Sequence, residues 1–193
     1  MKKIPKISAI LLAAGLSHRM GEDKLRLPYK GKTILQHAVD LLAKLPVSEK
    51  IIVTSKVRLD YMHVPQRVLV ITNPSPEKGQ SGSIRLGLEA ATGDWYFFMA
   101  ADQPGLTADD LHPLLEYAGG HERRIVYPVI DKKPCSPTLF SHDFRKELLA
   151  LSGDTGGSAV RDAHPKACIG YEPGYPKHFL DVDIVADYQS LFD

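Results

Sequence analysis

Two glycines and two basic residues that follow the first apolar run of the chain could bind a phosphorylated ligand. The run ends at Gly15, and Arg19, Gly21 and Lys24 come within the next nine residues. Glycine allows the close approach and the backbone angles that turn main-chain N–H groups toward phosphate oxygens. Arginine adds a flat fork of donors, and lysine adds a mobile point charge. The segment predicts a buried strand followed by an anion-binding loop.

The spacing within this loop differs from the two common phosphate-binding patterns. Five residues separate Gly15 from Gly21, and Lys24 is followed by Leu25, which excludes the Walker sequence. The dinucleotide fingerprint is excluded as well, because it needs a second glycine two residues after the first, and Ser17 stands there. A strand-to-helix turn that carries two surface cations is the alternative interpretation.

An aspartate at the end of the most apolar stretch is the second candidate for chemistry. Residues 95–101 read WYFFMAA and run directly into Asp102, Gln103 and Pro104. A carboxylate after a central strand lies at the carboxyl edge of the sheet, where open α/β sheets bind ligands. Magnesium is often held by one or two carboxylates together with substrate phosphates and water. Asp102 is therefore expected to bind a metal, and a turn residue ahead of Pro104 is the alternative.

Short apolar runs and helical patterns alternate along the chain, which is typical of a parallel sheet covered by helices. Strands are predicted at residues 7–14, 50–54, 68–72, 95–101, 125–130 and 138–140. Helices are predicted at residues 34–43, 81–91 and 186–191, after Thr107, and from Phe144 to a turn near Gly153. Thr33 and Thr107 supply capping patterns at two of the helix starts. The runs at 50–54 and 68–72 are interpreted as strands buried on both faces.

The composition predicts a single domain without a nucleic-acid or membrane partner. The 193 residues suit one domain, and the 24 basic and 23 acidic residues nearly cancel, which gives no support to a nucleic-acid-binding surface. The first apolar run is too short to span a membrane and carries no convincing cleavage site. Cys135 and Cys168 lack a C-x-x-C spacing, and no two histidines form a metal-binding pair. We expect a cytoplasmic protein.

Six segments in order along the chain carry a resemblance to known enzymes. The first, from Leu11, reads LLAAGLSHRMGEDKLRLPYKGKTILQH and resembles the signature of nucleotidyltransferases that activate small metabolites with NTPs. Within this MobA-like NTP transferase superfamily, the chain is most similar to the molybdenum cofactor cytidylyltransferases. The other segments are GQSGSIRLGLEAA from Gly79, AADQPGLTADDL from Ala100, SPTLFSHDF from Ser136, LSGDTGG from Leu151 and DVDIVADY from Asp181.

The resemblance implies a fold and a division of the chain. The implied fold is α/β and Rossmann-like, with three layers, α/β/α, and a mostly parallel central sheet. Residues 1–193 are expected to form one nucleotidyltransferase domain. Residues 1–118 are its nucleotide-binding half, and residues 119–193 are its acceptor-binding half and the C-terminal helix.

The resemblance also implies roles for individual residues. The implied nucleotide-binding residues are Leu12, Ala13, Ala14, Gly15, Ser17, Arg19, Lys24, Gln80, Ser81, Gly82, Ser83 and Ala101. The implied acceptor-binding residues are Pro137, Gly153, Asp154 and Gly156. Catalysis is implied for Arg19, Lys24 and Asp102, and metal binding for Asp102 and Asp183. Without the resemblance, residues 79–83 read as a helix N-cap and residues 153–157 as a turn between helices.

Two segments depart from the family pattern. Ile184 and Val185 follow Asp183 where the family usually has Thr-Pro. Cys135 and Ser136 precede the next proline where the family usually has a glycine-containing sequence. The acceptor contacts therefore stay open at this point.

The activity that the resemblance implies is transfer of CMP from CTP to the phosphate of a molybdopterin-type molybdenum cofactor, with release of pyrophosphate. Mg²⁺ is the implied cofactor, with Mn²⁺ as an alternative. CTP is favoured over GTP because the related guanylyltransferases have Gly-Gly where this chain has Ala14 and Gly15. An added methyl group beside the base disfavours a larger purine, and one such methyl is typically worth about 1–3 kcal/mol.

Two other functions stay open. One is NTP transfer that uses GTP or that acts on another acceptor, such as a sugar phosphate or methylerythritol phosphate. The other is a non-catalytic chaperone that binds the cofactor and hands it to a molybdenum hydroxylase, and a transient contact with such a hydroxylase or an accessory protein is a further expectation. Arg19, Lys24, Asp102 and Asp183 together favour the enzyme, since a carrier has little need for a cage around a metal and a triphosphate.

Overall fold

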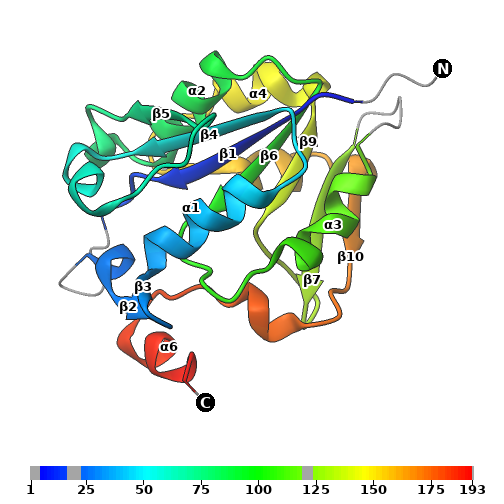
Figure 1. Cartoon of the computed structure of the whole chain (residues 1–193). Helices are drawn as coiled ribbons and strands as arrows, with labels where there is room; N and C mark the ends of the chain where they lie inside the picture. The colour runs from blue at the N-terminus through cyan, green and yellow to red at the C-terminus, as the bar shows by residue number, and fades with distance from the viewer. Residues whose placement is uncertain (1–4, 17–22, 119–123, 193) are drawn as a thin grey trace.

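The computed structural model describes residues 5–16, 23–118 and 124–192, and it is built around one mixed β-sheet (Figure 1). The strands of this sheet are β1 (Ile7–Ala13), β4 (Glu49–Thr54), β5 (Leu69–Thr72), β6 (Trp95–Ala100), β7 (Ile125–Ile130), β8 (Lys133–Pro134), β9 (Thr138–Ser141) and β10 (Cys168–Tyr171). Their order is β10-β7-β9-β6-β1-β4-β5, and β8 pairs with β7 outside this path. A separate hairpin consists of β2 (Pro28–Tyr29) and β3 (Lys32–Thr33).

The central sheet is mostly parallel, as predicted. β1 pairs in parallel with both β4 and β6, β5 continues in parallel beside β4, and β10 runs parallel to β7. β9 is antiparallel to both of its neighbours, β6 and β7. It therefore joins the strands of the first half of the chain to those of the second half in one continuous sheet.

Helices cover both faces of the sheet, which confirms the three-layer α/β/α arrangement. The helices are α1 (Ile34–Lys44), α2 (Gln80–Ala90), α3 (Ala108–Glu116), α4 (Arg145–Leu149), α5 (Gly157–Ala163) and α6 (Val185–Ser190). Figure 1 shows α1 and α3 on one side of the sheet and α2 and α4 on the other. Successive side chains of a strand point to opposite faces. Leu11 accordingly belongs to the core under α1 and α3, and Ile10 to the core under α2 and α4.

Two predicted helix starts are confirmed by their hydrogen bonds. The Thr33 hydroxyl accepts a bond from the Gln36 N–H at 3.1 Å and caps α1. Thr107 and Asp110 form a reciprocal capping box at α3, because the side chain of each accepts a bond from the backbone N–H of the other. Such caps satisfy N–H groups that the first turn of a helix leaves without partners.

Some short elements differ from the sequence predictions. The run at 68–72 forms an edge strand, and Leu69 is 50% exposed, so the prediction that it is buried on both faces was wrong. The hairpin, β8, β10 and α5 were not predicted. β10 is an edge strand of four residues that includes Gly170, and it joins the sheet by pairing with β7. A short strand that contains glycine has a weak sequence pattern. In the described part of the chain, no helix is long and apolar enough to cross a membrane.

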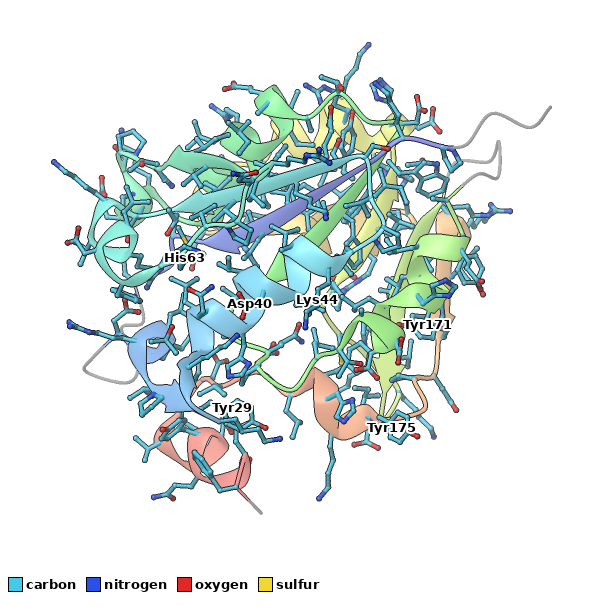
Figure 2. All side chains as sticks on the ribbon, in the orientation of Figure 1. Tyr29, Asp40, Lys44, His63, Tyr171 and Tyr175 are labelled. Carbon is cyan, nitrogen blue, oxygen red and sulfur yellow. The ribbon has the colours of Figure 1, made fainter. Side chains whose placement is uncertain are left out.

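The C-terminal helix is held against the hairpin near the edge of the sheet. The Tyr188 hydroxyl donates a hydrogen bond to the Pro28 carbonyl at 2.5 Å. The ring of Tyr29, which Figure 2 shows above α6, meets the ring of Phe192 edge to face with 5.8 Å between centroids. These contacts fix the position of the segment that leads into α6, and this segment contains Asp183.

Candidate active site

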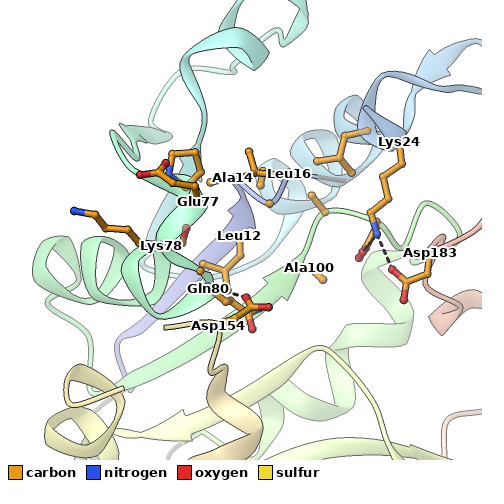
Figure 3. Close-up of a pocket in the computed structure, with 18 of the residues that line it drawn as sticks. Leu12, Ala14, Leu16, Lys24, Glu77, Lys78, Gln80, Ala100, Asp154 and Asp183 are labelled. Atoms are coloured by element: carbon orange, nitrogen blue, oxygen red, sulfur yellow. Dashed lines mark hydrogen bonds and ion pairs between the residues drawn. The ribbon is translucent and has the colours of Figure 1, made fainter. Parts of the chain in front are cut away.

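A pocket of about 760 Å³ opens at the carboxyl ends of β1 and β6. Because the two strands are parallel neighbours, the residues that follow them meet at this edge, which is where open α/β sheets bind ligands. Gly15 and Leu16 come from the end of β1, Asp102 comes from the end of β6, and Gln80 and Ser83 come from the first turn of α2. Figure 3 shows Gln80 beside Asp154 on one side of the pocket and Lys24 beside Asp183 on the other.

Lys24 lies between two carboxylates that are distant in sequence. Its Nζ is 2.6 Å from Asp102 Oδ2 and 2.9 Å from Asp183 Oδ1 (Figure 3). Burial alone would lower the pKa of Lys24, but the charges and hydrogen bonds of the two aspartates outweigh it and raise this pKa. The ammonium group is therefore charged at neutral pH.

The backbone around Asp183 explains why this residue reaches Lys24. The N–H of Val182, a residue with no exposed surface, donates a bond to the Asp102 carbonyl at 2.9 Å. One side-chain oxygen of Asp187 accepts bonds from the N–H groups of Asp183 and Ile184, each at 2.9 Å. These contacts fix the position of Asp183 without the Thr-Pro sequence that the family usually has next.

The two aspartates fit a divalent cation. Asp102 Oδ1 is buried and accepts no hydrogen bond from the described part of the chain. An orphaned carboxylate oxygen near a second aspartate suits a hard cation, which prefers oxygen ligands. Within the part of the chain that the structure describes, no three His, Cys, Asp or Glu side chains are grouped so that they could hold a metal, which leaves the other ligands to substrate phosphates and water.

The start of α2 is joined to the turn that precedes α5. The Ser81 hydroxyl donates to the Gly153 carbonyl at 2.7 Å, and the Gln80 N–H donates to Asp154 Oδ1 at 3.2 Å. Gly79 has φ +96°, and a Cβ there would lie 2.5 Å from the Gly153 carbonyl and the Asp154 nitrogen. The segment implied to bind the nucleotide and the segment implied to bind the acceptor thus contact each other directly.

We expect Gly79→Ala to disrupt this junction. The backbone conformation at Gly79 is accessible almost only to glycine and costs roughly 1–3 kcal/mol for another residue, and the added methyl group would also clash. The variant should unfold at lower urea concentration and should bind NTP more weakly. Gly174→Ala is the control, since a Cβ there meets nothing within 4 Å. Wild-type stability and nucleotide affinity for Gly79→Ala would contradict this account of the junction.

The structure brings most of the implied site residues to the pocket. Those that line it are Leu12, Ala13, Ala14, Gly15, Lys24, Gln80, Ser83, Ala101, Asp102, Gly153, Asp154 and Asp183. Ser17 and Arg19 lie outside the described residues. Four others, Ser81, Gly82, Pro137 and Gly156, are not among the lining residues. The functional roles of all these residues stay predictions.

Two of the four residues that do not line the pocket, Ser81 and Gly156, lie against residues that do. The Ser81 hydroxyl donates to the Gly153 carbonyl, and a Cβ on Gly156 would lie 2.2 Å from Gln80 Oε1. Pro137 follows a cis peptide bond, and the carbonyl of the preceding Ser136 accepts a bond from Gln103, which does not line the pocket. The contacts of Ser81 and Gly156 indicate that these two residues position pocket residues.

Three polar residues of the site region were not found from the sequence. Glu77 and Lys78 line the pocket from the short 3-10 helix η4 (Pro76–Lys78), which brings one charge of each sign to it. Arg58 lies behind the end of β1, in the 3-10 helix η3 (Lys56–Tyr61). None of the three belongs to a spaced motif, and the partners of Arg58 include backbone carbonyls, which leave no signature in the sequence.

The sequence of this chain is similar to those of nucleotidyltransferases. The model of the family described as MobA-like NTP transferase domain matches residues 9–168. A molybdenum cofactor guanylyltransferase of Syntrophotalea carbinolica is 38% identical over 102 residues, which are 53% of this chain and 47% of the relative. The aligned part thus spans about half the length of that relative. A molybdenum cofactor cytidylyltransferase of Escherichia coli is 29% identical over 139 residues, which are 67% of this chain and 71% of the relative.

Solved structures share the fold at lower sequence identity. A protein of Mycobacterium tuberculosis superposes with a TM-score of 0.82 at 23% identity and covers 98% of both chains. A nucleotidyl transferase of a Methanothermobacter species superposes with a TM-score of 0.80 at 24% identity and covers 96% of this chain and 95% of its own. The M. tuberculosis protein has also been solved in complex with manganese. That structure superposes with a TM-score of 0.76 at 21% identity and covers 96% of this chain and 97% of the solved chain.

Proposed function

We propose, from the premise that this chain belongs to the family of MobA-like NTP transferase domains, that it transfers CMP from CTP to the phosphate of a molybdopterin-type cofactor. The observation that carries the proposal is the position of Lys24 between Asp102 and Asp183, at the edge of a pocket large enough for a nucleotide. This arrangement provides a fixed positive charge and a pair of carboxylates beside the place where a triphosphate would bind.

The reaction needs no covalent intermediate on the protein. An oxygen of the acceptor phosphate attacks the α-phosphorus of the nucleotide in line, and the bond from that phosphorus to the oxygen bridging to the β-phosphate breaks. Pyrophosphate leaves with the electron pair of that bond. The protein contributes geometry and charge. Lys24 stabilises the charge that develops on the phosphates, and Arg19 is a further cation for the leaving group.

Asp102 and Asp183 are the residues that would hold Mg²⁺, or Mn²⁺ in its place. The cation supplies Lewis-acid stabilisation of the phosphate oxygens when bound. Its support in this chain is the buried, unpartnered Oδ1 of Asp102 and the position of Asp183, which shares the Lys24 ammonium with Asp102.

Ala14 supports CTP as the nucleotide. It is 2% exposed and lines the pocket directly before Gly15. We expect Ala14→Gly to lower the ratio of kcat/KM for CTP over GTP by roughly tenfold or more, because removing the methyl group makes room for the larger base. Ala9→Gly is a matched control, since Ala9 is buried in β1, the strand that Ala14 directly follows, and does not line the pocket. An unchanged ratio in Ala14→Gly would remove this argument for CTP.

Guanylyl transfer is the second candidate, and the observation that favours it is the name of the relative with 38% identity, a guanylyltransferase. Pyrophosphate release separates the candidates when the purified protein is given molybdenum cofactor, Mg²⁺ and each of CTP, GTP, ATP and UTP in turn. Release with CTP alone is the expected result. Release with GTP alone would overturn the base assignment, and silence with all four, alongside cofactor binding, would favour a carrier.

The acceptor and any protein partner are parts of the same proposal. The acceptor is expected against the segment of Gly153 and Asp154, which lines the pocket opposite Lys24 (Figure 3). A molybdenum hydroxylase or an accessory protein would then take the product in a transient contact.

A further inference from the structure

Arg58 is a buried arginine next to the pocket that the proposed reaction does not use. It lies in η3, directly after β4, and only 3% of its surface is exposed. Burying a charged group is costly unless it is paired and its hydrogen-bonding groups have partners. The contacts of Arg58 therefore indicate what this charge does in the fold.

The guanidinium group connects two segments of the site. One segment, at the end of β1, lines the pocket, and the other leads into Lys24. Nη1 donates to the Ala13 carbonyl at 2.5 Å, and Nη2 donates to the Gly15 carbonyl at 2.6 Å. On its other side, Nε and Nη2 donate to the two carboxylate oxygens of Asp23, at 2.9 and 2.7 Å. One side chain thus binds the end of β1 and the residue that directly precedes Lys24.

Asp23 is held in turn by the elements around it. The Tyr61 hydroxyl donates to Asp23 Oδ2 at 2.5 Å, and the Leu25 N–H donates to Asp23 Oδ1 at 3.3 Å. Asp23 is thereby the N-cap of the 3-10 helix η2 (Lys24–Arg26). Burial would raise the pKa of Asp23, but its bonds with Arg58 and Tyr61 outweigh it and lower this pKa, so the carboxylate is charged.

The same contacts determine where the peptide carbonyls at the end of β1 point. The carbonyl oxygens of Ala13 and Gly15 carry partial negative charge, which would repel a phosphate if they faced it. Arg58 donates to both oxygens, and the buried Thr54 hydroxyl also donates to the Ala13 carbonyl, at 3.2 Å.

We propose that Arg58 is a positioning residue for nucleotide binding, which with Asp23 and Tyr61 fixes Gly15 and Lys24 relative to each other. The inference rests on the proposed nucleotidyl transfer, because Gly15 and Lys24 lie where the triphosphate would bind. Arginine suits this position because its planar fork bonds the carboxylate through two nitrogens while it reaches both carbonyls. Lysine has one nitrogen and cannot make all four bonds.

The first test is nucleotide binding by Arg58→Lys, which keeps the charge and loses the fork. We expect the Kd for CTP with Mg²⁺, measured by calorimetry without acceptor, to rise roughly tenfold or more. The kcat/KM should fall by about 10²-fold, the loss that a misplacement of about 1 Å can cause. Arg161→Lys is the matched control, because Arg161 pairs with Asp162 at 2.9 Å in α5 and is expected to change neither value.

Tyr61→Phe gives a milder version of the same change. It removes one donor to Asp23 and leaves the bonds between Arg58 and Asp23 in place, so the Kd should rise in the same direction by a smaller factor. This variant also keeps the test available if Arg58→Lys does not fold.

Hydrogen exchange of the free protein tests the positioning role without any nucleotide. The amides of residues 13–15 and 23–27 should exchange faster in Arg58→Lys, or in Tyr61→Phe, while those of α3 and β7 keep their wild-type rates. Unchanged exchange at these two segments would overturn the inference, and so would faster exchange spread evenly over the chain. If the wild-type protein bound none of the four NTPs, the proposed function would fail, and the exchange result would still decide whether Arg58 fixes Gly15 and Lys24 relative to each other.

Discussion

Replacing Lys24 with methionine is expected to lower nucleotidyl transfer by about 10²-fold to 10³-fold without unfolding the protein, which is the typical cost of removing one well-placed charged donor. Methionine keeps much of the side-chain volume and removes the ammonium group that lies 2.6 Å from Asp102 and 2.9 Å from Asp183. Steady-state pyrophosphate release and circular dichroism would measure turnover and folding. Wild-type turnover in the folded variant would contradict the role of Lys24.

Lys32→Met is the matched control for this substitution. Lys32 also forms an ion pair with an aspartate, Asp40, but its side chain is 53% exposed and does not line the pocket. A metal titration adds a readout that is independent of turnover. Because Lys24 Nζ bonds to one oxygen of each carboxylate that would hold the cation, Lys24→Met should bind Mn²⁺ at least as tightly as the wild type does in the absence of nucleotide.

Replacing Asp102 with asparagine is expected to affect metal binding and turnover together. The amide removes the negative charge and one carboxylate oxygen, and a neutral amide is a weaker ligand for a hard cation. We expect the affinity for Mn²⁺, measured by calorimetry, to fall by at least about tenfold, as even outer-shell changes can produce this loss. Turnover should fall by about 10²-fold or more.

Asp40→Asn is the control for the loss of an aspartate charge, since Asp40 pairs with Lys32 on the surface of α1. It should leave both metal affinity and turnover unchanged. Asp102→Asn with wild-type metal affinity would overturn the assignment of Asp102 as a ligand, even if its turnover were low. Metal affinity is thus expected to fall in Asp102→Asn but not in Lys24→Met. This difference distinguishes the role of the Lys24 ammonium group from that of the bound metal.

The sequence was informative where residue type and periodicity determine local structure. The apolar runs of β1 and β6 were predicted within one residue of their observed ends, and both lie in the buried centre of the sheet. Asp102 is separated from the end of β6 by Ala101 alone, so its position at the carboxyl edge followed from the strand. The caps at Thr33 and Thr107 were also predictable, because their hydrogen bonds join residues three apart.

Other parts of the site depend on contacts between distant segments. Lys24 and Asp183 are 159 residues apart, and only the resemblance to a known family placed them together. The junction between Gly79 and Gly153 looks in the sequence like a cap and a turn, because what matters there is the lack of a side chain. Arg58 could not be identified, since two of its partners are backbone carbonyls.

The most direct test of nucleotidyl transfer follows each phosphate of the nucleotide to its product. The purified protein would be incubated with molybdenum cofactor, Mg²⁺ and CTP that is radiolabelled either at the α-phosphate or at the γ-phosphate. We predict that the α-label appears on the cofactor and the γ-label in pyrophosphate, and that Lys24→Met reduces both. Transfer of the γ-label to the cofactor, or release of both labels without a labelled cofactor, would contradict the proposed reaction.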